Sequence, residues 1–222
     1  MKRQVVFMQT EEIVKQAQEW VRDFFEGEAS GHDWWHTYRV VELAKTIARE
    51  EKADLFVCEL AALLHDMADS KFNETEADGI QKVAGWLDDK QVRKEERDHV
   101  LEIISTMSFR GGHNPPMKTI EGKVVQDADR LDAIGALGIA RTFAFSGAHG
   151  HPIYVPGEQP QEAMSKEEYE KRQSSAVNHF YEKLLLLKEK LNTDYGKEIG
   201  KERHLFMVNF LEQFYLEWNG EK

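Results

Sequence analysis

The sequence predicts an all-α fold in a single domain, on three observations. Apolar residues recur at three- and four-residue spacing along most of the 222-residue chain, which is the pattern of helices with one buried face. We find no convincing run of alternating apolar and polar residues, which would indicate a half-buried strand. Residues 56–64 hold a single charged side chain, Glu59, so this segment is expected to be a helix that protein encloses on most sides.

Two helices are expected before this buried segment. An apolar stripe from Ile13 to Phe24 ends near Gly27, and Asp33 then stands where a capping residue would begin the next helix. The apolar stripe of that second helix consists of Val40, Leu43, Ala44 and Ile47. Four residues before Val40 the same stripe reaches His36, so this imidazole is expected to point into the core.

The buried helix ends in polar residues, because His65 and Asp66 follow Leu64 directly and Asp69 comes one turn later. Burial of such groups without partners costs several kcal/mol, so each requires a counter-charge, a hydrogen bond or a metal ion. For a lone His-Asp pair, hydrogen bonding in the core is the more frequent case. A metal site therefore needs further ligands from elsewhere in the chain.

The next segments alternate between helices and loops. Asn73 and Thr75 are candidate caps for a helix, and its apolar face is formed by Ile80, Val83, Ala84 and Leu87. A further helix carries Val100, Ile103, Ile104 and Met107. Residues 108–122 are rich in Gly and Pro, and we expect a loop there. A helix is then predicted from Val124 towards Phe143.

The last third of the chain is expected to contain an irregular segment and two helices. Residues 146–165 are rich in Gly and Pro, as in lids, binding loops or mobile segments. One closing helix is predicted from Val177, Phe180, Leu184, Leu187 and Leu191, and the other from Phe206, Met207, Phe210, Phe214 and Trp218. No repeat, low-complexity segment or second domain is indicated, so residues 1–222 are expected to form one domain.

Composition limits the classes of function. A hydrophobic content of 41% is enough for a substantial core, and a net charge of −11 argues against a broad nucleic-acid-binding surface. The single cysteine, Cys58, lies in the apolar helix, which excludes an intrachain disulfide and fits a reducing compartment. Residues 5–8 are too short for a signal-peptide core, and no apolar run approaches about 20 residues. A cytoplasmic, soluble protein is expected.

The polar residues on these helices form a candidate metal-binding set. His36, His65, Asp66 and Asp129 provide two imidazoles and two carboxylates. Such a mixed nitrogen and oxygen set suits a borderline or hard divalent ion such as Mn²⁺, Mg²⁺, Fe²⁺, Co²⁺ or Ni²⁺. Zn²⁺ is less favoured without thiolates.

The segments around these residues resemble the HD-domain phosphohydrolase superfamily, in which a His, an adjacent His-Asp and a distant Asp lie on different helices. The matching segments are residues 35–40 (WHTYRV), 63–66 (LLHD) and 127–132 (DADRLD). The resemblance covers residues 33–142 and implies a helical bundle, with helices of residues 168–218 packed on this core. Residues 66–72 and the later run GALGIAR are similar to small bacterial HD hydrolases, some of which act on nucleoside triphosphates.

By this resemblance the metal ligands are His36, His65, Asp66 and Asp129. Asp127 and Asp132 compete for the fourth position, and the family pattern Ala-Asp-Arg-Leu selects Asp129. Asp132, one turn on, is a candidate to hold a substrate hydroxyl or a water. Asp127 is expected near the start of its helix, where the dipole favours a carboxylate.

The other histidines bear on the number of metal ions. His99 and His113 lie between the doublet and the last Asp but lack the adjacent His pair of two-metal relatives. One ion is therefore expected, with Mn²⁺ or Mg²⁺ favoured and Fe²⁺, Co²⁺, Ni²⁺ or Zn²⁺ as alternatives. His149 and His151 are interpreted as loop residues near the substrate rather than as a metal clamp.

Residues near the doublet are candidates for catalysis and substrate binding. If the helix continues past His65, Asp69 lies on the same face and acts as general base or orients water; the alternative is that it caps a turn. Charge that develops on phosphoryl oxygens requires cations. We assign Lys71 to catalysis, and Arg39 and Arg110 to substrate binding. Two other arginines, Arg130 and Arg141, are expected to form salt bridges on the acidic helix.

The predicted function is a metal-dependent phosphohydrolase of nucleotides that cleaves a nucleoside triphosphate to the monophosphate and pyrophosphate. Alternative activities are a nucleoside 5′-monophosphatase, a ppGpp hydrolase and a cyclic-nucleotide phosphodiesterase. The non-enzymatic alternative is a nucleotide or metal sensor, and an all-α interaction protein without a site is disfavoured. The expected partner is a small phosphate ester or anhydride, with no extended nucleic acid and no membrane. Trp34, Trp86 and Trp218 are expected to serve either a homodimer or the core.

Overall fold

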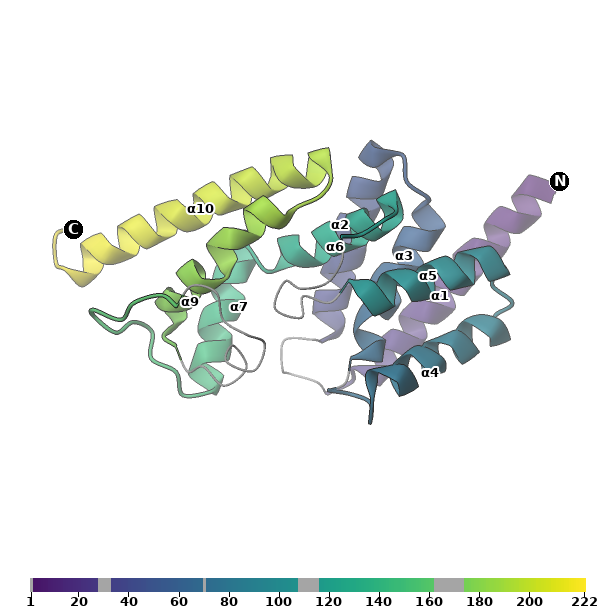
Figure 1. Ribbon diagram of the computed structural model, residues 1–222, viewed down its shortest axis with the longest axis horizontal. Helices are drawn as coiled ribbons and strands as arrows, with labels where there is room; N and C mark the ends of the chain where they lie inside the picture. The colour runs from purple at the N-terminus through teal and green to yellow at the C-terminus, as the bar shows by residue number, and fades with distance from the viewer. Residues whose placement is uncertain (1, 28–32, 70, 108–115, 162–173) are drawn as a thin grey trace. The chain divides into compact units, whose positions relative to one another are not determined.

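The computed structural model describes residues 2–27, 33–69, 71–107, 116–161 and 174–222. Within these ranges every regular element is a helix (Figure 1), which confirms the all-α prediction. The chain groups into two compact units. The first consists of Met1–Phe109 and Asn114–Ala128, and the second of Arg110–His113 and Asp129–Lys222. None of the described helices is long and apolar enough to span a membrane.

The first unit is organised around one buried helix. Its elements are α1 (Lys2–Phe24), α2 (Trp34–Glu51), α3 (Leu55–Leu64), the 3-10 helix η1 (His65–Ala68), α4 (Glu76–Asp89), α5 (Lys94–Thr106) and most of α6 (Ile120–Asp132). Helix α3 packs against α1, α2 and α5, and residues 60–64 are buried on every side. The prediction of an enclosed helix is thus confirmed. Cys58 in α3 is fully buried, and this burial raises the pKa of its thiol.

Two predicted helix caps are present in the first unit. The side chain of Asp33 accepts a hydrogen bond from the backbone N–H of His36 at 2.8 Å, and Thr75 accepts one from Asp78 at 3.1 Å. Each satisfies one of the backbone donors that the first turn of a helix leaves without an intrahelical partner. These contacts set the starts of α2 and α4.

The second unit is built around the long C-terminal helix. It contains the end of α6, α7 (Gly135–Ala148), α9 (Ala176–Glu182), the 3-10 helix η3 (Leu184–Lys190) and α10 (Asp194–Trp218). Helices α7 and η3 pack against α10, and α9 contacts α7 and η3. The ring of Phe210 on α10 lies 5.8 Å from Phe143 on α7 and 6.1 Å from Phe180 on α9, between ring centroids. These aromatic side chains join the three helices.

The prediction of one helix from Val124 towards Phe143 is wrong, because two helices occupy this region. Helix α6 ends at Asp132, and Ile134 has an extended backbone. Gly135 then adopts φ +79°, a conformation that glycine tolerates best. A Cβ at Gly135 would lie 3.0 Å from the side chain of Arg203, so a larger residue here would also press on α10.

The start of α6 also differs from the prediction. The helix begins at Ile120, because the hydroxyl of Thr119 accepts a hydrogen bond from Gly122 at 3.2 Å and caps the first turn. The expected loop therefore ends before Gly122, and residues 108–115 of it lie outside the described part. Asp127 consequently lies in the second half of α6, where it is fully buried. Its predicted place at a helix start is wrong.

Two further boundaries correct the sequence prediction, and the structure also places the three tryptophans. The irregular segment expected from residue 146 begins at His149, because α7 continues to Ala148, and residues 162–173 lie outside the described part. The first closing helix is divided at Lys183, whose φ of −141° separates α9 from η3. Trp86 lies in the first unit stacked on Trp20, with 5.0 Å between ring centroids. Trp34 is half-buried, and Trp218 is 50% exposed.

Candidate metal centre

His36 lies in the first turn of α2, on the face that packs into the first unit. Its side chain is on the same stripe as Val40, Ala44 and Ile47, and the residue is only 2% exposed. Because Asp33 caps the helix through the N–H of His36, the cap fixes the backbone from which this imidazole projects. The predicted core-facing position of His36 is confirmed.

His65 and Asp66 are placed by the end of α3. The α-helix passes into the 3-10 helix η1 at His65, and both residues are buried. The Nδ1 atom of His65 lies 2.8 Å from the carbonyl oxygen of Ala62. A carbonyl can only accept a hydrogen bond, so Nδ1 carries the proton. In the neutral ring Nε2 is then the atom with a lone pair, which is the tautomer that a metal ligand needs.

The three side chains converge on one point in the first unit. The Asp66 carboxylate lies between the two imidazoles, with Oδ2 at 3.5 Å from Nε2 of His36 and Oδ1 at 3.3 Å from Nε2 of His65. The two rings are 5.4 Å apart, between centroids. One nitrogen or oxygen atom from each of the three residues lies within 4.8 Å of those of the other two.

This donor set fits a divalent metal ion. Two imidazole nitrogens and a carboxylate oxygen that lie within 4.8 Å of one another form a mixed site for a borderline or hard cation. A carboxylate between two imidazoles also supplies the negative charge that a buried cation requires. The backbone hydrogen bond of His65 is the outer contact that orients such a ligand. His36, His65 and Asp66 could therefore hold the ion.

Asp69 and Lys71 lie just beyond η1. The α-helix does not continue past His65: the chain tightens into a 3-10 helix there, and the backbone of Asp69 is extended. Asp69 therefore does not share a helical face with His65. Its Oδ1 accepts a hydrogen bond from the N–H of Lys71 at 2.8 Å, which is the turn geometry of the alternative interpretation. Asp69 is half-buried and Lys71 is exposed. Their catalytic roles stay predictions.

The remaining acidic candidates lie at the end of α6 in the second unit. Asp129 is half-buried, and its assignment as the fourth ligand stays a prediction. Asp132 is fully buried and ion-paired with Arg141 of α7. Arg130 hydrogen-bonds the backbone carbonyl of Lys190. The salt bridge expected of Arg141 is therefore present.

The other predicted side chains are distributed over both units. Arg39 lies one turn after His36 on α2 and is half-buried, whereas Arg110 and His113 lie outside the described residues. On α5, the Nε2 atom of His99 is 2.8 Å from the hydroxyl of Thr119, so His99 has a structural contact between helices.

The two histidines after α7 have aromatic surroundings. The ring of His149 stacks on Phe145 with 3.9 Å between centroids, and the His151 ring lies 6.1 Å from that of His149. His149 is exposed and its Nδ1 atom lies 2.9 Å from the carbonyl of Phe145. A loop position for the two histidines is thus confirmed, and their predicted proximity to substrate stays a prediction.

Two contributors to these clusters are absent from the sequence-based prediction. The carbonyl of Ala62 fixes the tautomer of His65, and Arg203 of α10 donates a hydrogen bond to the carbonyl of Leu131 at 2.6 Å near the buried Asp132. Ala62 stands three residues before His65, a helical spacing that could have indicated the contact. No local pattern relates Arg203 to α6, because the two are distant in sequence.

Comparisons with known proteins agree with this geometry. Residues 34–134 match the HD domain family. The uncharacterized protein YpgQ of Bacillus subtilis is 46% identical over 205 residues, which cover 90% of this chain and 92% of YpgQ. A crystal structure of an HD-superfamily hydrolase from Bacillus thuringiensis is 44% identical, with a TM-score of 0.78 over 95% of this chain and 98% of that one. The crystal structure of YpgQ in complex with ADP has a TM-score of 0.76 and covers 94% of this chain and 96% of that one, at 40% identity.

Proposed function

The chain belongs to the HD domain family of metal-dependent phosphohydrolases, and on that premise we propose that it hydrolyses nucleoside triphosphates to a monophosphate and pyrophosphate. The observation that carries the proposal is the convergence of His36, His65 and Asp66 within 4.8 Å. The complex of YpgQ with ADP supports a nucleotide as the substrate class. The experiment below determines which phosphate bond of the nucleotide is cleaved.

Three residues of the first unit would hold the ion, for which we propose Mn²⁺ or Mg²⁺, and Asp129 is the proposed fourth ligand. When bound, a divalent ion supplies Lewis acidity towards a phosphoryl oxygen and makes water more acidic. Asp66 keeps both imidazoles oriented from its position between them. His65 presents Nε2 because its Nδ1 proton is held by Ala62.

The remaining roles concern water and phosphate. We assign Asp69 to orient or deprotonate the attacking water and Lys71 to stabilise the charge that develops on phosphoryl oxygens. Arg39 and Arg110 are the proposed phosphate-binding cations. Asp132 is the proposed ligand of a substrate hydroxyl, although its ion pair with Arg141 supports a positioning role for the acidic helix equally well.

The decisive experiment measures phosphate and pyrophosphate separately for a panel of nucleoside mono-, di- and triphosphates, ppGpp and cyclic nucleotides. Each nucleotide is tested with Mn²⁺, Mg²⁺, Co²⁺ and chelator. We expect pyrophosphate from triphosphates, loss of turnover with chelator and recovery with Mn²⁺. Release of phosphate from monophosphates alone would instead identify a 5′-monophosphatase. Turnover that changes with neither chelator nor added metal would contradict the proposal.

A matched pair of histidine variants separates an enzyme from a nucleotide sensor. His65→Ala removes a proposed ligand, so turnover should fall by at least about a hundredfold while the helical content is retained. His99→Gln keeps a hydrogen-bonding group near Thr119 and should leave turnover unchanged. A sensor would bind nucleotide without turnover in the wild-type protein, and equal activity of His65→Ala and wild type would exclude this metal centre.

A further inference from the structure

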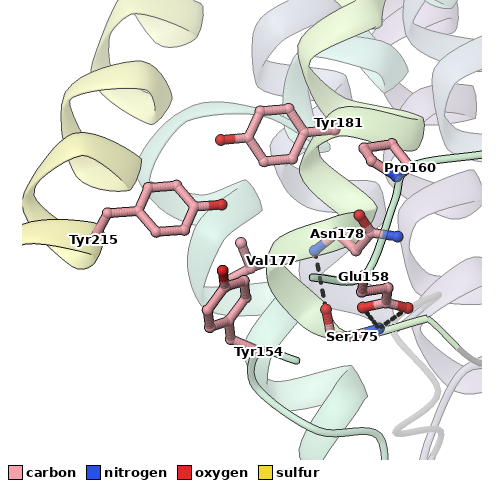
Figure 2. Close-up of a pocket in the computed structure, with 8 residues that line it drawn as sticks. All are labelled: Tyr154, Glu158, Pro160, Ser175, Val177, Asn178, Tyr181 and Tyr215. Carbon is pink, nitrogen blue, oxygen red and sulfur yellow. Dashed lines mark hydrogen bonds between the residues drawn. The ribbon is translucent and has the colours of Figure 1, made fainter. Parts of the chain in front are cut away.

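The second unit contains a pocket of about 180 Å³. Its walls come from the segment that follows α7, from α9 with its cap Ser175, and from α10 (Figure 2). None of the described side chains assigned to metal, substrate or catalysis lines it. A volume of this size admits a small organic molecule.

Three tyrosines direct their hydroxyl groups towards the same part of this pocket. Figure 2 shows Tyr154, Tyr181 and Tyr215 reaching in from three different segments with their phenolic oxygens inward. The rings of Tyr154 and Tyr215 are 5.5 Å apart at a steep angle. Burial and a hydrogen bond to the hydroxyl of Tyr181 raise the pKa of Tyr215. Its hydroxyl therefore stays neutral, and the oxygens keep lone pairs that can accept hydrogen bonds.

The opposite wall adds a carboxylate and an amide. Glu158 is the one charged side chain among the described residues that line the pocket. Among the described residues its two oxygens have a single donor, the N–H of Ser175, at 3.4 and 3.3 Å. A carboxylate has about four acceptor positions, so Glu158 keeps capacity for a ligand. The amide nitrogen of Asn178 donates to Glu182 at 3.0 Å.

The pocket thus combines many acceptors, one negative charge and an apolar strip. Its described lining includes no lysine, arginine or histidine, whereas Val177 and Pro160 supply apolar surface. Among the described lining residues, an anion would meet the Glu158 carboxylate and no compensating cation, which is costly inside a pocket. A ligand ammonium group carries three donors and no acceptor and complements such a lining.

We propose that this pocket binds a small primary ammonium compound, with the ammonium group at Glu158 and the tyrosine hydroxyls and a short alkyl part against Val177 and Pro160. Hydrogen bonds from a charged donor to a carboxylate are stronger than neutral ones, so Glu158 provides most of the affinity. The proposal is independent of the phosphohydrolase activity, because none of its residues has a role there.

The test is an NMR chemical-shift titration of the full-length protein with butylammonium chloride. Butanol, sodium butyrate and tetramethylammonium chloride serve as neutral, anionic and quaternary comparison ligands. We expect saturable shifts at pocket residues with butylammonium, and binding at least about tenfold weaker for the three comparison ligands. The proposal is overturned if butanol or butyrate binds as tightly as butylammonium, or if tetramethylammonium binds more tightly. It is also overturned if butylammonium causes no shifts.

Substitutions identify the pocket as the binding site. Glu158→Gln keeps an acceptor for Ser175 but removes the charge, and should weaken butylammonium binding by about tenfold or more. Tyr181→Phe removes one hydroxyl and should weaken binding less. Glu212→Gln makes the same change at an exposed position of α10 and should leave binding unchanged. If Glu158→Gln folds and binds butylammonium like the wild-type protein, the assignment is wrong.

Discussion

The side chain of Asp66 is the centre of the metal-binding cluster, because it contacts both imidazoles. Its two oxygens lie 3.5 Å from His36 and 3.3 Å from His65. The residue is 7% exposed, and a buried carboxylate requires compensation by donors or a cation. A divalent ion would provide this compensation for Asp66 while accepting the lone pairs of the two rings. These three side chains thus form one donor set.

Asp69 has a role in the turn that can be separated from its proposed role in catalysis. Asn at this position keeps an oxygen for the Lys71 N–H but cannot act as a base. We expect Asp69→Asn to lower kcat by about a hundredfold or more without changing Mn²⁺ affinity, measured by steady-state kinetics and by calorimetric titration. If kcat is unchanged, Asp69 has only its structural role in the turn.

We expect His179 on α9 to make an acid-sensitive contribution to the stability of the folded protein. Burial is the main cause that lowers the pKa of His179 from 6.5 to about 4. Between these values the unfolded chain binds a proton that the folded chain does not, so this contribution is complete above about pH 6.5 and is lost as the pH falls towards 4. Urea unfolding at several pH values should therefore show a smaller acid loss for His179→Gln than for wild type. Identical pH dependence would contradict this assignment.

At the scale of elements, the end of α3 determines how the His-Asp doublet is presented. The change to a 3-10 helix at His65 keeps His65 and Asp66 buried and directs the chain outward at Asp69. Helix α4 packs on η1, and Asn73 holds the turn by donating to the carbonyls of Met67 and Asp69 at 2.8 and 2.9 Å. The doublet is therefore supported from both sides of the turn.

Two glycines of α4 provide a matched test of this support. A Cβ at Gly79 would lie 2.6 Å from the backbone of Ala68 in η1, whereas a Cβ at Gly85 has no neighbour within 4 Å. Gly79→Ala should destabilise the protein by about 1–3 kcal/mol, because α4 must move away from η1. Gly85→Ala should stabilise it by about 0.5–1 kcal/mol through helix propensity.

Chemical denaturation measures both variants, and metal titration gives the functional consequence. Mn²⁺ affinity should fall for Gly79→Ala, because the displaced η1 carries His65 and Asp66, and should stay unchanged for Gly85→Ala. Equal stability and affinity of the two variants would show that the packing of α4 on η1 does not position the doublet.

At the scale of the whole molecule, the metal centre exists only in the folded chain. His36 lies on α2, whereas His65 and Asp66 lie on η1, and folding of the first unit brings them together. An ion that binds the native state more tightly than the unfolded state raises stability by mass action. Metal binding and folding of the first unit are therefore thermodynamically linked.

This linkage predicts a shift of the melting temperature. At Mn²⁺ concentrations of about 100 times Kd, the stabilisation of about 2.7 kcal/mol should raise Tm by about 5–10 °C, and chelator should reverse the shift. Differential scanning calorimetry provides the measurement. The His65→Ala variant should show little shift, and a full shift in that variant would place the ion elsewhere.

Four features could be predicted from the sequence: the helical class, the enclosed helix α3, the caps Asp33 and Thr75, and the grouping of His36, His65 and Asp66. These features are encoded locally, in apolar periodicity, in capping residues and in short segments that resemble a known family. The family match confirms that resemblance.

Features that depend on contacts between distant residues became visible in the folded chain alone. A Cβ at Gly135 would lie 3.0 Å from the side chain of Arg203 on α10, and one at Gly79 would lie 2.6 Å from the backbone of Ala68. The tyrosine pocket arises because Tyr154, Tyr181 and Tyr215 meet from three segments. Periodicity indicates which face of a helix is buried but not which residue lies opposite it. These helix ends and the pocket therefore could not be predicted from the sequence.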